Sequence, residues 1–260
     1  MKNISHLFTF VVLLSGILMM SCDNNAPFEP PPNNGNNGGI GGTTVPPMFE
    51  DFWDDVTISS EGNDIIIETT SVPEYRSPYF SPASGNQIQY NGSNPNFEAN
   101  PYFIQEQNIK FKIPMTQDIA VNPEQVPHDS PIGVALNGVV LYSGFSGPNN
   151  EPLTAEAFNS LDINHGHPDS VGVYHYHLPP DFILNTINEN SIVGVMLDGY
   201  PIYGPVENGQ PINSFNLDEF HGHFHSTFHR PDSIYHYHMT FDAPYFIGSK
   251  YFGVPGTVEN

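Results

Sequence analysis

The chain has 260 residues and is strongly acidic, with 28 Asp and Glu against six Lys and Arg and a formal net charge of −22 at pH 7. This charge makes nucleic acid and anionic membrane surfaces unfavourable partners. The sequence contains one cysteine, which excludes a disulfide within the chain. Stability must therefore come from a buried core or from bound metal.

The first 21 residues resemble a bacterial signal peptide. Lys2 provides a basic start, and residues 7–20 form an apolar run that is short for a membrane span. The run ends at Met19-Met20-Ser21-Cys22, which resembles a lipobox, and Cys22 is the only cysteine. We expect an exported lipoprotein that is lipidated at Cys22 and held at the periplasmic or outer side of the cell envelope by its lipid alone. The alternative is an ordinary signal peptide followed by an incidental thiol.

Residues 22–47 are rich in Pro, Asn and Gly and cannot bury a core. They predict a flexible tether after the lipidated cysteine. The composition changes near Met48 to aromatic and aliphatic residues, so residues 48–260 are expected to form the folded part.

The folded part is predicted to be mainly β, compact, and poor in helix. Residues 56–58 and 65–67 are short β-branched runs on either side of a turn, and residues 110–113 alternate between basic and apolar side chains. Residues 153–161 predict a short helix capped by Thr154.

Two further hairpins are predicted around Asn137-Gly138 and Asp198-Gly199, where both turn residues are expected to adopt positive φ. Each hairpin is followed by a connector and a histidine-rich strand. The chain is therefore expected to contain an internal repeat at about 132–184 and 193–247, made of duplicated hairpin and histidine-strand units.

The histidines carry the strongest functional signal, because ten of the twelve fall between His165 and His238. Residues 162–177 contain an Asp, a His-Gly-His element, a Pro-Asp-Ser turn and a Tyr-His-Tyr-His run. Residues 218–238 repeat this order with a longer insert, which adds His225 and His229 without a predicted role.

The spacing predicts metal binding. In an extended strand the two histidines of each Tyr-His-Tyr-His run share one face and the tyrosines share the other. The adjacent His-Gly-His element, in which the glycine is expected to allow a tight turn, would add further nitrogen ligands. Such ligands suit copper, zinc, iron or nickel, and copper or zinc is the predicted ion. The predicted metal ligands are His165, His167, His175, His177, His221, His223, His236 and His238.

Two questions stay open at this point. The same histidines could instead be buried in hydrogen bonds to main-chain groups and tyrosine hydroxyls. If they bind metal, the repeat allows one site in each half or one shared site, because pairing of the halves is expected to bring their histidine strands together. Five residues are candidates for supporting a metal ligand or for acid-base chemistry: Asp162, Asp198, Asp218, Tyr174 and Tyr235.

Several segments identify the chain as resembling the YHYH-domain family, which is defined by the Tyr-His-Tyr-His run. They are residues 106–107, 109–114, 133–138, 197–204 and 244–248, in addition to the two histidine runs. The resemblance covers roughly residues 64–251 and implies no established reaction. Many family members have a cysteine shortly before each Gly-His, whereas Asn164 and Phe220 stand near those places here, so a thiolate ligand or disulfide carried by such relatives is absent.

Three functions are compatible with these features. The first is capture or buffering of a transition metal in the cell envelope. The second is a metal-dependent enzyme of unknown substrate, although no known hydrolase motif is present. The third is a surface domain that recognises glycan or protein and uses its histidines structurally, with a partner that the sequence leaves unidentified.

Overall fold

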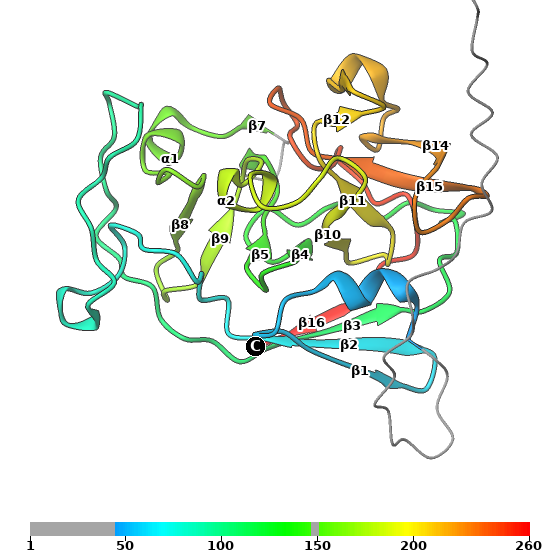
Figure 1. The fold of residues 1–260 in the computed structure, drawn as a ribbon, viewed down its shortest axis with the longest axis horizontal. Coiled ribbons are helices and arrows are strands. Elements are labelled where there is room, and N and C mark those ends of the chain that lie inside the picture. Colours follow the sequence, from blue (N-terminus) through cyan, green and yellow to red (C-terminus); the bar gives the residue numbers. More distant parts are fainter. Residues whose placement is uncertain (1–44, 147–150) are drawn as a thin grey trace, which may run out of the picture. The chain divides into compact units, whose positions relative to one another are not determined.

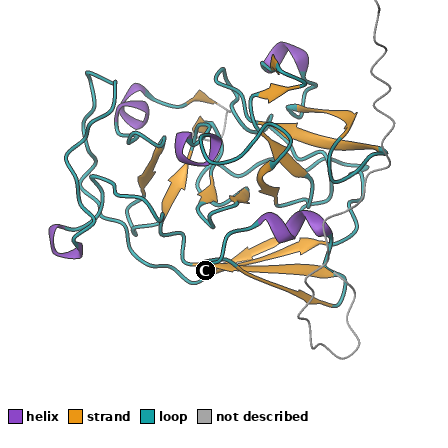
Figure 2. Ribbon diagram, in the orientation of Figure 1, coloured by secondary structure: helices purple, strands orange, loops and turns teal. Residues whose placement is uncertain are grey.

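A computed structural model describes residues 45–146 and 151–260, which form a β-rich fold with two short α-helices among the described residues (Figures 1 and 2). The predicted mainly β fold is confirmed. The predicted signal peptide, Cys22 and nearly all of the predicted tether lie outside the described residues. Within them, no helix combines the length and apolar character needed to cross a membrane.

Four strands form a small antiparallel sheet in the order β1-β2-β3-β16. Their bounds are β1 Thr57–Glu61, β2 Asp64–Thr69, β3 Ile109–Pro114 and β16 Thr257–Glu259. In β3, Phe111 and Ile113 are buried while Lys110 and Lys112 are partly exposed, as the alternating sequence predicts. The first and last strands of the fold thus belong to one sheet.

Eight strands form the large sheet in the order β14-β15-β11-β10-β4-β5-β9-β8. Their bounds are β4 Gly133–Ala135, β5 Val140–Leu141, β8 Gly166–Pro168, β9 Tyr174–Tyr176, β10 Ile192–Met196, β11 Pro201–Tyr203, β14 Gly222–Ser226 and β15 Ser233–His238. Read outward from the centre, β4-β5-β9-β8 matches β10-β11-β15-β14. The sheet consists of two corresponding halves that meet where β4 pairs antiparallel with β10.

The histidine strands lie at opposite ends of this order, which corrects the expectation that they would come together. The hairpin strands β4 and β10 form the junction between the halves because both are apolar and fully buried. Each histidine pair, β8-β9 and β14-β15, is therefore on the outer side of its own half. A single shared histidine site is excluded.

Shorter elements connect these strands. They are the 3₁₀ helices η1 Pro47–Asp51, η2 Pro82–Ser84 and η3 Ser214–Asn216, the helices α1 Ala155–Asn159 and α2 Asp181–Leu184, and the two-strand pairs β6 Phe145–Ser146 with β7 Glu151–Pro152 and β12 Val206–Glu207 with β13 Gln210–Pro211. The predicted short helix is α1, and the Thr154 hydroxyl accepts from the Ala157 N–H at its start.

The turns of the two central hairpins differ from the prediction. Gly138 and Gly199 have φ of 78° and 83°, but Asn137 and Asp198 do not have positive φ. In the first hairpin, the Gly138 N–H donates to the Ala135 carbonyl, which is the arrangement of a type I turn followed by a left-handed glycine. The Asn and Asp side chains are consequently free to bind neighbouring groups.

Candidate metal centres

The His-Gly-His element begins with a turn that is closed by an aspartate. In the first half, Asp162 Oδ1 accepts from the Asn164 N–H at 2.8 Å and the Gly166 N–H at 3.4 Å. In the second half, Asp218 Oδ1 accepts from the Phe220 and Gly222 N–H groups at 3.0 and 3.1 Å. Both aspartates therefore fix the chain direction just before the histidine strand.

The left-handed residue of each turn is a histidine and not the glycine, which corrects the role predicted for the glycine. His165 and His221 have φ of 64° and 74°. A Cβ on Gly166 would lie 2.5 Å from Tyr174 Cζ, and one on Gly222 would lie 2.4 Å from the Tyr235 hydroxyl. The glycines are thus needed because a tyrosine ring of the neighbouring strand packs directly against the backbone.

The left-handed turn directs the first histidine of each element away from the second. His165 Nδ1 donates to the Pro179 carbonyl at 2.7 Å, and His221 Nε2 is bonded to the Thr240 hydroxyl at 2.9 Å. The expectation that both histidines of the element converge on one ion assumed regular strand alternation, which the turn interrupts. The structure therefore places His165 and His221 outside both clusters of histidine nitrogens.

The remaining three histidines of the first half converge, and we call them the first centre: His167, His175 and His177. His167 on β8 is directly opposite His175 on β9. The Nε2 atoms of His175 and His177 lie 3.0 Å apart. All three side chains are buried, and the Tyr142 ring stacks on His175 with a centroid distance of 4.0 Å. The predicted sharing of one face by His175 and His177 is observed.

Hydrogen bonds at the other ring nitrogen define the tautomers of the first centre. His175 Nδ1 lies 2.9 Å from the Val173 carbonyl and His177 Nδ1 lies 2.8 Å from the Ser143 carbonyl, so both Nδ1 atoms must donate. The Ser160 hydroxyl donates to the Ala157 carbonyl and accepts from His167 Nδ1 at 2.7 Å. Each Nε2 in the neutral rings therefore presents a lone pair to the others.

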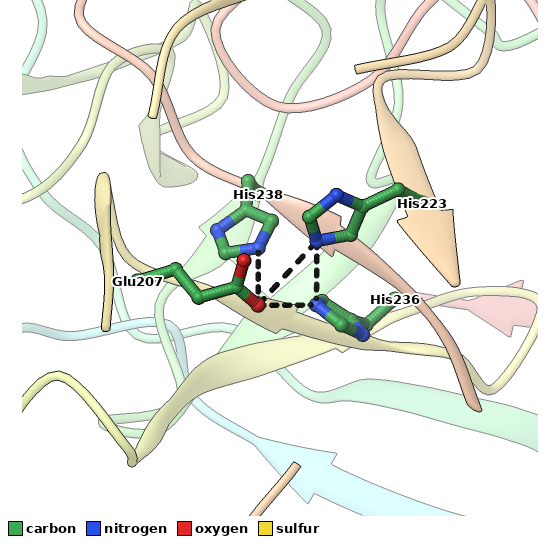
Figure 3. Close-up of side chains that lie close together, drawn as sticks. All are labelled: Glu207, His223, His236 and His238. Carbon is green, nitrogen blue, oxygen red and sulfur yellow. Dashed lines mark hydrogen bonds and ion pairs between the residues drawn. The ribbon is translucent and has the colours of Figure 1, made fainter. Parts of the chain in front are cut away.

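The second centre combines three histidines of the second half with a carboxylate: Glu207, His223, His236 and His238 (Figure 3). His223 on β14 is opposite His236 on β15, and their Nε2 atoms are 3.1 Å apart. Glu207 Oε1 lies 3.5 Å from the Nε2 of His223, 3.5 Å from that of His236 and 3.9 Å from that of His238. Figure 3 shows the carboxylate and the three imidazoles pointing toward one another.

In the second centre the same tautomer is fixed for two of the three histidines. His236 Nδ1 donates to the Ile234 carbonyl at 3.2 Å, and His238 Nδ1 donates to the Gly204 carbonyl at 2.8 Å. His238 is 1% exposed, and its Nε2 has no hydrogen-bond partner. A buried ring nitrogen without a partner costs free energy unless a cation or proton occupies the space it faces.

Burial keeps the following four of these imidazoles in the neutral form at neutral pH. It lowers the pKa of His167 to about 3 and that of His177 to about 4. Burial also lowers the pKa of His236 and His238 to about 4 each, with a contribution from the neighbouring histidines. Burial acts to raise the pKa of Glu207, but the imidazoles around it outweigh this effect and lower it. At neutral pH these four histidines therefore offer neutral nitrogens and Glu207 offers a carboxylate, which are the forms that bind metal.

The tyrosines of the two runs point to the opposite side of the strands, and the first tyrosine of each run binds a predicted acidic residue. Tyr174 donates to Asp162 Oδ2 at 2.8 Å, and Tyr235 donates to Asp218 Oδ1 at 2.9 Å. These hydrogen bonds stabilise the turn before each His-Gly-His element. The structure thus gives Asp162, Asp218, Tyr174 and Tyr235 positions that support the strands and do not face the ligand nitrogens.

Asp198 is fully buried and also lies away from the centres. Its Oδ2 accepts from the Tyr237 hydroxyl at 2.6 Å and from the Gly253 N–H at 2.8 Å. Burial raises the pKa of Asp198 to about 6. In the first half the corresponding turn residue is Asn137, whose Nδ2 lies 3.1 Å from the Tyr176 hydroxyl. The aspartate thus joins the second hairpin turn to the Tyr-His-Tyr-His strand and to the C-terminal segment.

Sequence reasoning missed Glu207. It is the second residue of β12, and the second residue of β6, at the matching strand position of the first half, is Ser146. Aligning the two repeats beyond their hairpins would have shown a lone acidic residue at this place. The two extra histidines of the second half have different surroundings. His225 Nδ1 lies 3.0 Å from Glu207 Oε1, whereas His229 Nε2 lies 3.1 Å from Asp51 Oδ2.

Both centres fit a transition-metal ion. With metal-nitrogen distances of about 2.05 Å, Nε2 atoms 3.0 to 3.1 Å apart correspond to angles of about 95–100° at the metal. Holding the second ring nitrogen by a carbonyl or hydroxyl is the usual way in which proteins orient histidine ligands. The residues would hold an ion by three nitrogens in the first centre and by three nitrogens and one oxygen in the second.

Comparison with known proteins identifies one family. Residues 110–214 match the family model described as YHYH protein. This segment contains the whole first centre, the second central hairpin and Glu207. No curated protein and no solved structure matches the chain. Over residues 110–214 the chain is therefore similar to the YHYH family.

Proposed function

We propose that this protein binds two transition-metal ions, one in each half of its large sheet, and captures or buffers copper or zinc in the cell envelope. The observation that carries the proposal is the convergence of three histidine ring nitrogens in each centre. In the first centre two Nε2 atoms are 3.0 Å apart, although neither carries a proton to share when both rings are neutral. A bound cation would convert this repulsion into two coordinate bonds.

The expected location in the cell envelope fits metal capture or buffering. A lipid on Cys22, followed by the Pro-, Asn- and Gly-rich segment 23–47, would hold the domain at the envelope while leaving it free to meet ions outside the cytoplasm. The acidic surface would raise the local concentration of cations around the protein.

The test compares the two histidines of each His-Gly-His element. The full chain is purified without a histidine tag, dialysed against Cu²⁺ or Zn²⁺ and then against buffer, and its metal content is measured by elemental analysis. We expect two equivalents per chain. His167→Asn and His223→Asn should each lose one equivalent.

The matched controls are His165→Asn and His221→Asn, which change the other histidine of the same element. Asparagine tolerates the left-handed backbone found there, so the turn is retained. Both controls should keep two equivalents. Wild-type protein that retains no metal, or controls that lose as much as the test variants, would refute the proposal.

A metal-dependent enzyme is the second candidate, and it is favoured by a cavity next to the second centre. The cavity has a volume of about 50 Å³ and is lined by Glu207, His236, His238 and the Tyr203 ring. This is room for a few water molecules beside a bound ion. Metal-dependent turnover that disappears in Glu207→Gln, while the metal content is retained, would place this candidate first.

A further inference from the structure

The two centres differ in how they are enclosed. His167, His175 and His177 of the first centre are 9%, 3% and 6% exposed. In the second centre the side chains of His223 and Glu207 are 25% and 21% exposed. The cavity of about 50 Å³ is lined by three residues of the second centre, Glu207, His236 and His238. An ion in the second centre would therefore have a shorter route to solvent.

The carboxylate of the second centre is carried by a small element of its own. Glu207 belongs to β12, which pairs only with β13 in a two-stranded ribbon outside the large sheet. The Asn208-Gly209 turn joins these strands, and both turn residues have positive φ. Glu207 can therefore change position without breaking hydrogen bonds of the large sheet, in contrast to His223 and His236, which are part of it.

A fifth donor lies on the solvent side of this carboxylate. His225 is two residues beyond His223 on β14, so its side chain is on the same face of the strand. Its side chain is 43% exposed and lines the cavity, and its Nδ1 lies 3.0 Å from Glu207 Oε1. That nitrogen is itself covered and lacks a partner in hydrogen-bond geometry. Glu207 thus stands between an exposed imidazole and three inner ones.

We propose that the second centre is the exchange site for metal and that His225 and Glu207 are the pair through which the ion enters and leaves. An incoming hydrated divalent ion loses water as it binds His225 Nδ1 and Glu207 Oε1. It then forms bonds to the Nε2 atoms of His223, His236 and His238 as the His225 bond breaks. The transfer is ligand exchange without a change in oxidation state. The first centre retains its ion.

This inference rests on the proposed function, and its test separates the two. The full chain is loaded with two equivalents of Zn²⁺ and mixed with excess EDTA in a stopped-flow instrument, with a zinc-sensitive dye reporting the free ion. We expect one equivalent to leave at least about tenfold faster than the other. Replacement of His175 by Asn should remove the slow phase and leave the fast one.

The variant that tests the entry pair is His225→Asn, with His128→Asn as the matched control because His128 belongs to neither centre. His225→Asn should slow the fast phase by about tenfold and still bind two equivalents at equilibrium, whereas the control should behave as wild type. Glu207→Gln should slow the fast phase and also weaken binding.

Equal release rates for both equivalents, or a fast phase unchanged in His225→Asn, would overturn the exchange proposal and leave metal binding intact. Failure to load Zn²⁺ or Cu²⁺ at all would overturn the proposed function and this inference together.

Discussion

The Nε2 atoms of His223 and His236 face each other across 3.1 Å between strands β14 and β15. His236 cannot donate through this nitrogen when neutral, because its proton is on Nδ1 and is bonded to the Ile234 carbonyl. The Nε2 of His236 therefore presents a lone pair beside the Glu207 carboxylate, and an ion at this place would be held by both.

Bound metal should therefore stabilise the fold. A ligand that binds only the folded state adds about 2.7 kcal/mol to the free energy of unfolding at a hundred times its Kd. We expect Zn²⁺ to raise the thermal midpoint of the wild-type protein, and the double variant His177→Asn with His238→Asn to lose this response. Calorimetry with and without chelator measures it. An identical midpoint in both conditions would contradict the prediction.

The metal-free protein should lose stability as the pH falls from 7.5 to 5. Burial lowers the pKa of His167 to about 3 and of His177 and His238 to about 4, whereas unfolded histidines titrate near 6.5. Between these values the unfolded state binds more protons, so acid favours unfolding by about 2 kcal/mol for each such histidine at pH 5. Asp198, whose pKa is raised to about 6, contributes in the opposite direction but is one group.

The pH dependence is measured by urea unfolding in the presence of a chelator. The double variant His177→Asn with His238→Asn removes two titrating groups and should show a flatter profile over the same range. A wild-type protein that is equally stable at both pH values would disprove the linkage.

Alanine in place of Gly166 should destabilise the protein. Its Cβ would lie 2.5 Å from Tyr174 Cζ, in a place where the ring is fully buried. Relieving such a contact in a packed core costs about 1–3 kcal/mol. Gly204→Ala is the matched control, because its Cβ would meet the flexible end of Leu184 at 3.2 Å. Denaturant unfolding compares the two, and equal losses would contradict the close-packing account.

Replacement of Tyr237 by Phe should lower stability by about 1–3 kcal/mol and leave the metal content unchanged. The Tyr237 hydroxyl donates to buried Asp198 at 2.6 Å and accepts from the Phe252 N–H at 2.7 Å, so its removal leaves both groups short of a partner. A second variant, Asp198→Asn, places at this turn the same amide side chain that the first half has at Asn137. A loss of bound metal in either variant would instead assign Asp198 to the centre.

Lipidation of Cys22 predicts that the protein fractionates with membranes. The Cys22→Ser variant should appear in the soluble envelope fraction and should not incorporate labelled palmitate. Equal membrane association of both proteins would show that the lipobox resemblance has no functional meaning.

Local patterns in the sequence predicted most of the individual strands. Of the eight histidines predicted as metal ligands, six converge in the structure. His175 and His177 share a face because β9 is regular, and the same holds for His236 and His238 on β15. His165 and His221 could not be placed, because a left-handed residue at the turn reverses the expected alternation. Such a turn depends on the aspartate that accepts hydrogen bonds across it.

Long-range relationships were not readable from local patterns. Glu207 lies on a separate two-stranded ribbon and reaches His236 of β15 through the fold, and no periodicity in residues 206–211 signals that approach. The separation of the two centres likewise follows from which strands pair at the middle of the sheet. Strand order depends on contacts between residues far apart in sequence.

The pairing of β3 with β16 places Phe111 opposite Val258. These partners are separated by most of the folded chain, and contacts of such high sequence separation slow folding because a long loop must close before they form. The small sheet therefore cannot be completed until the C-terminal strand is available. The other three strands are close in sequence, so β16 is the strand whose pairing requires the longest loop to close.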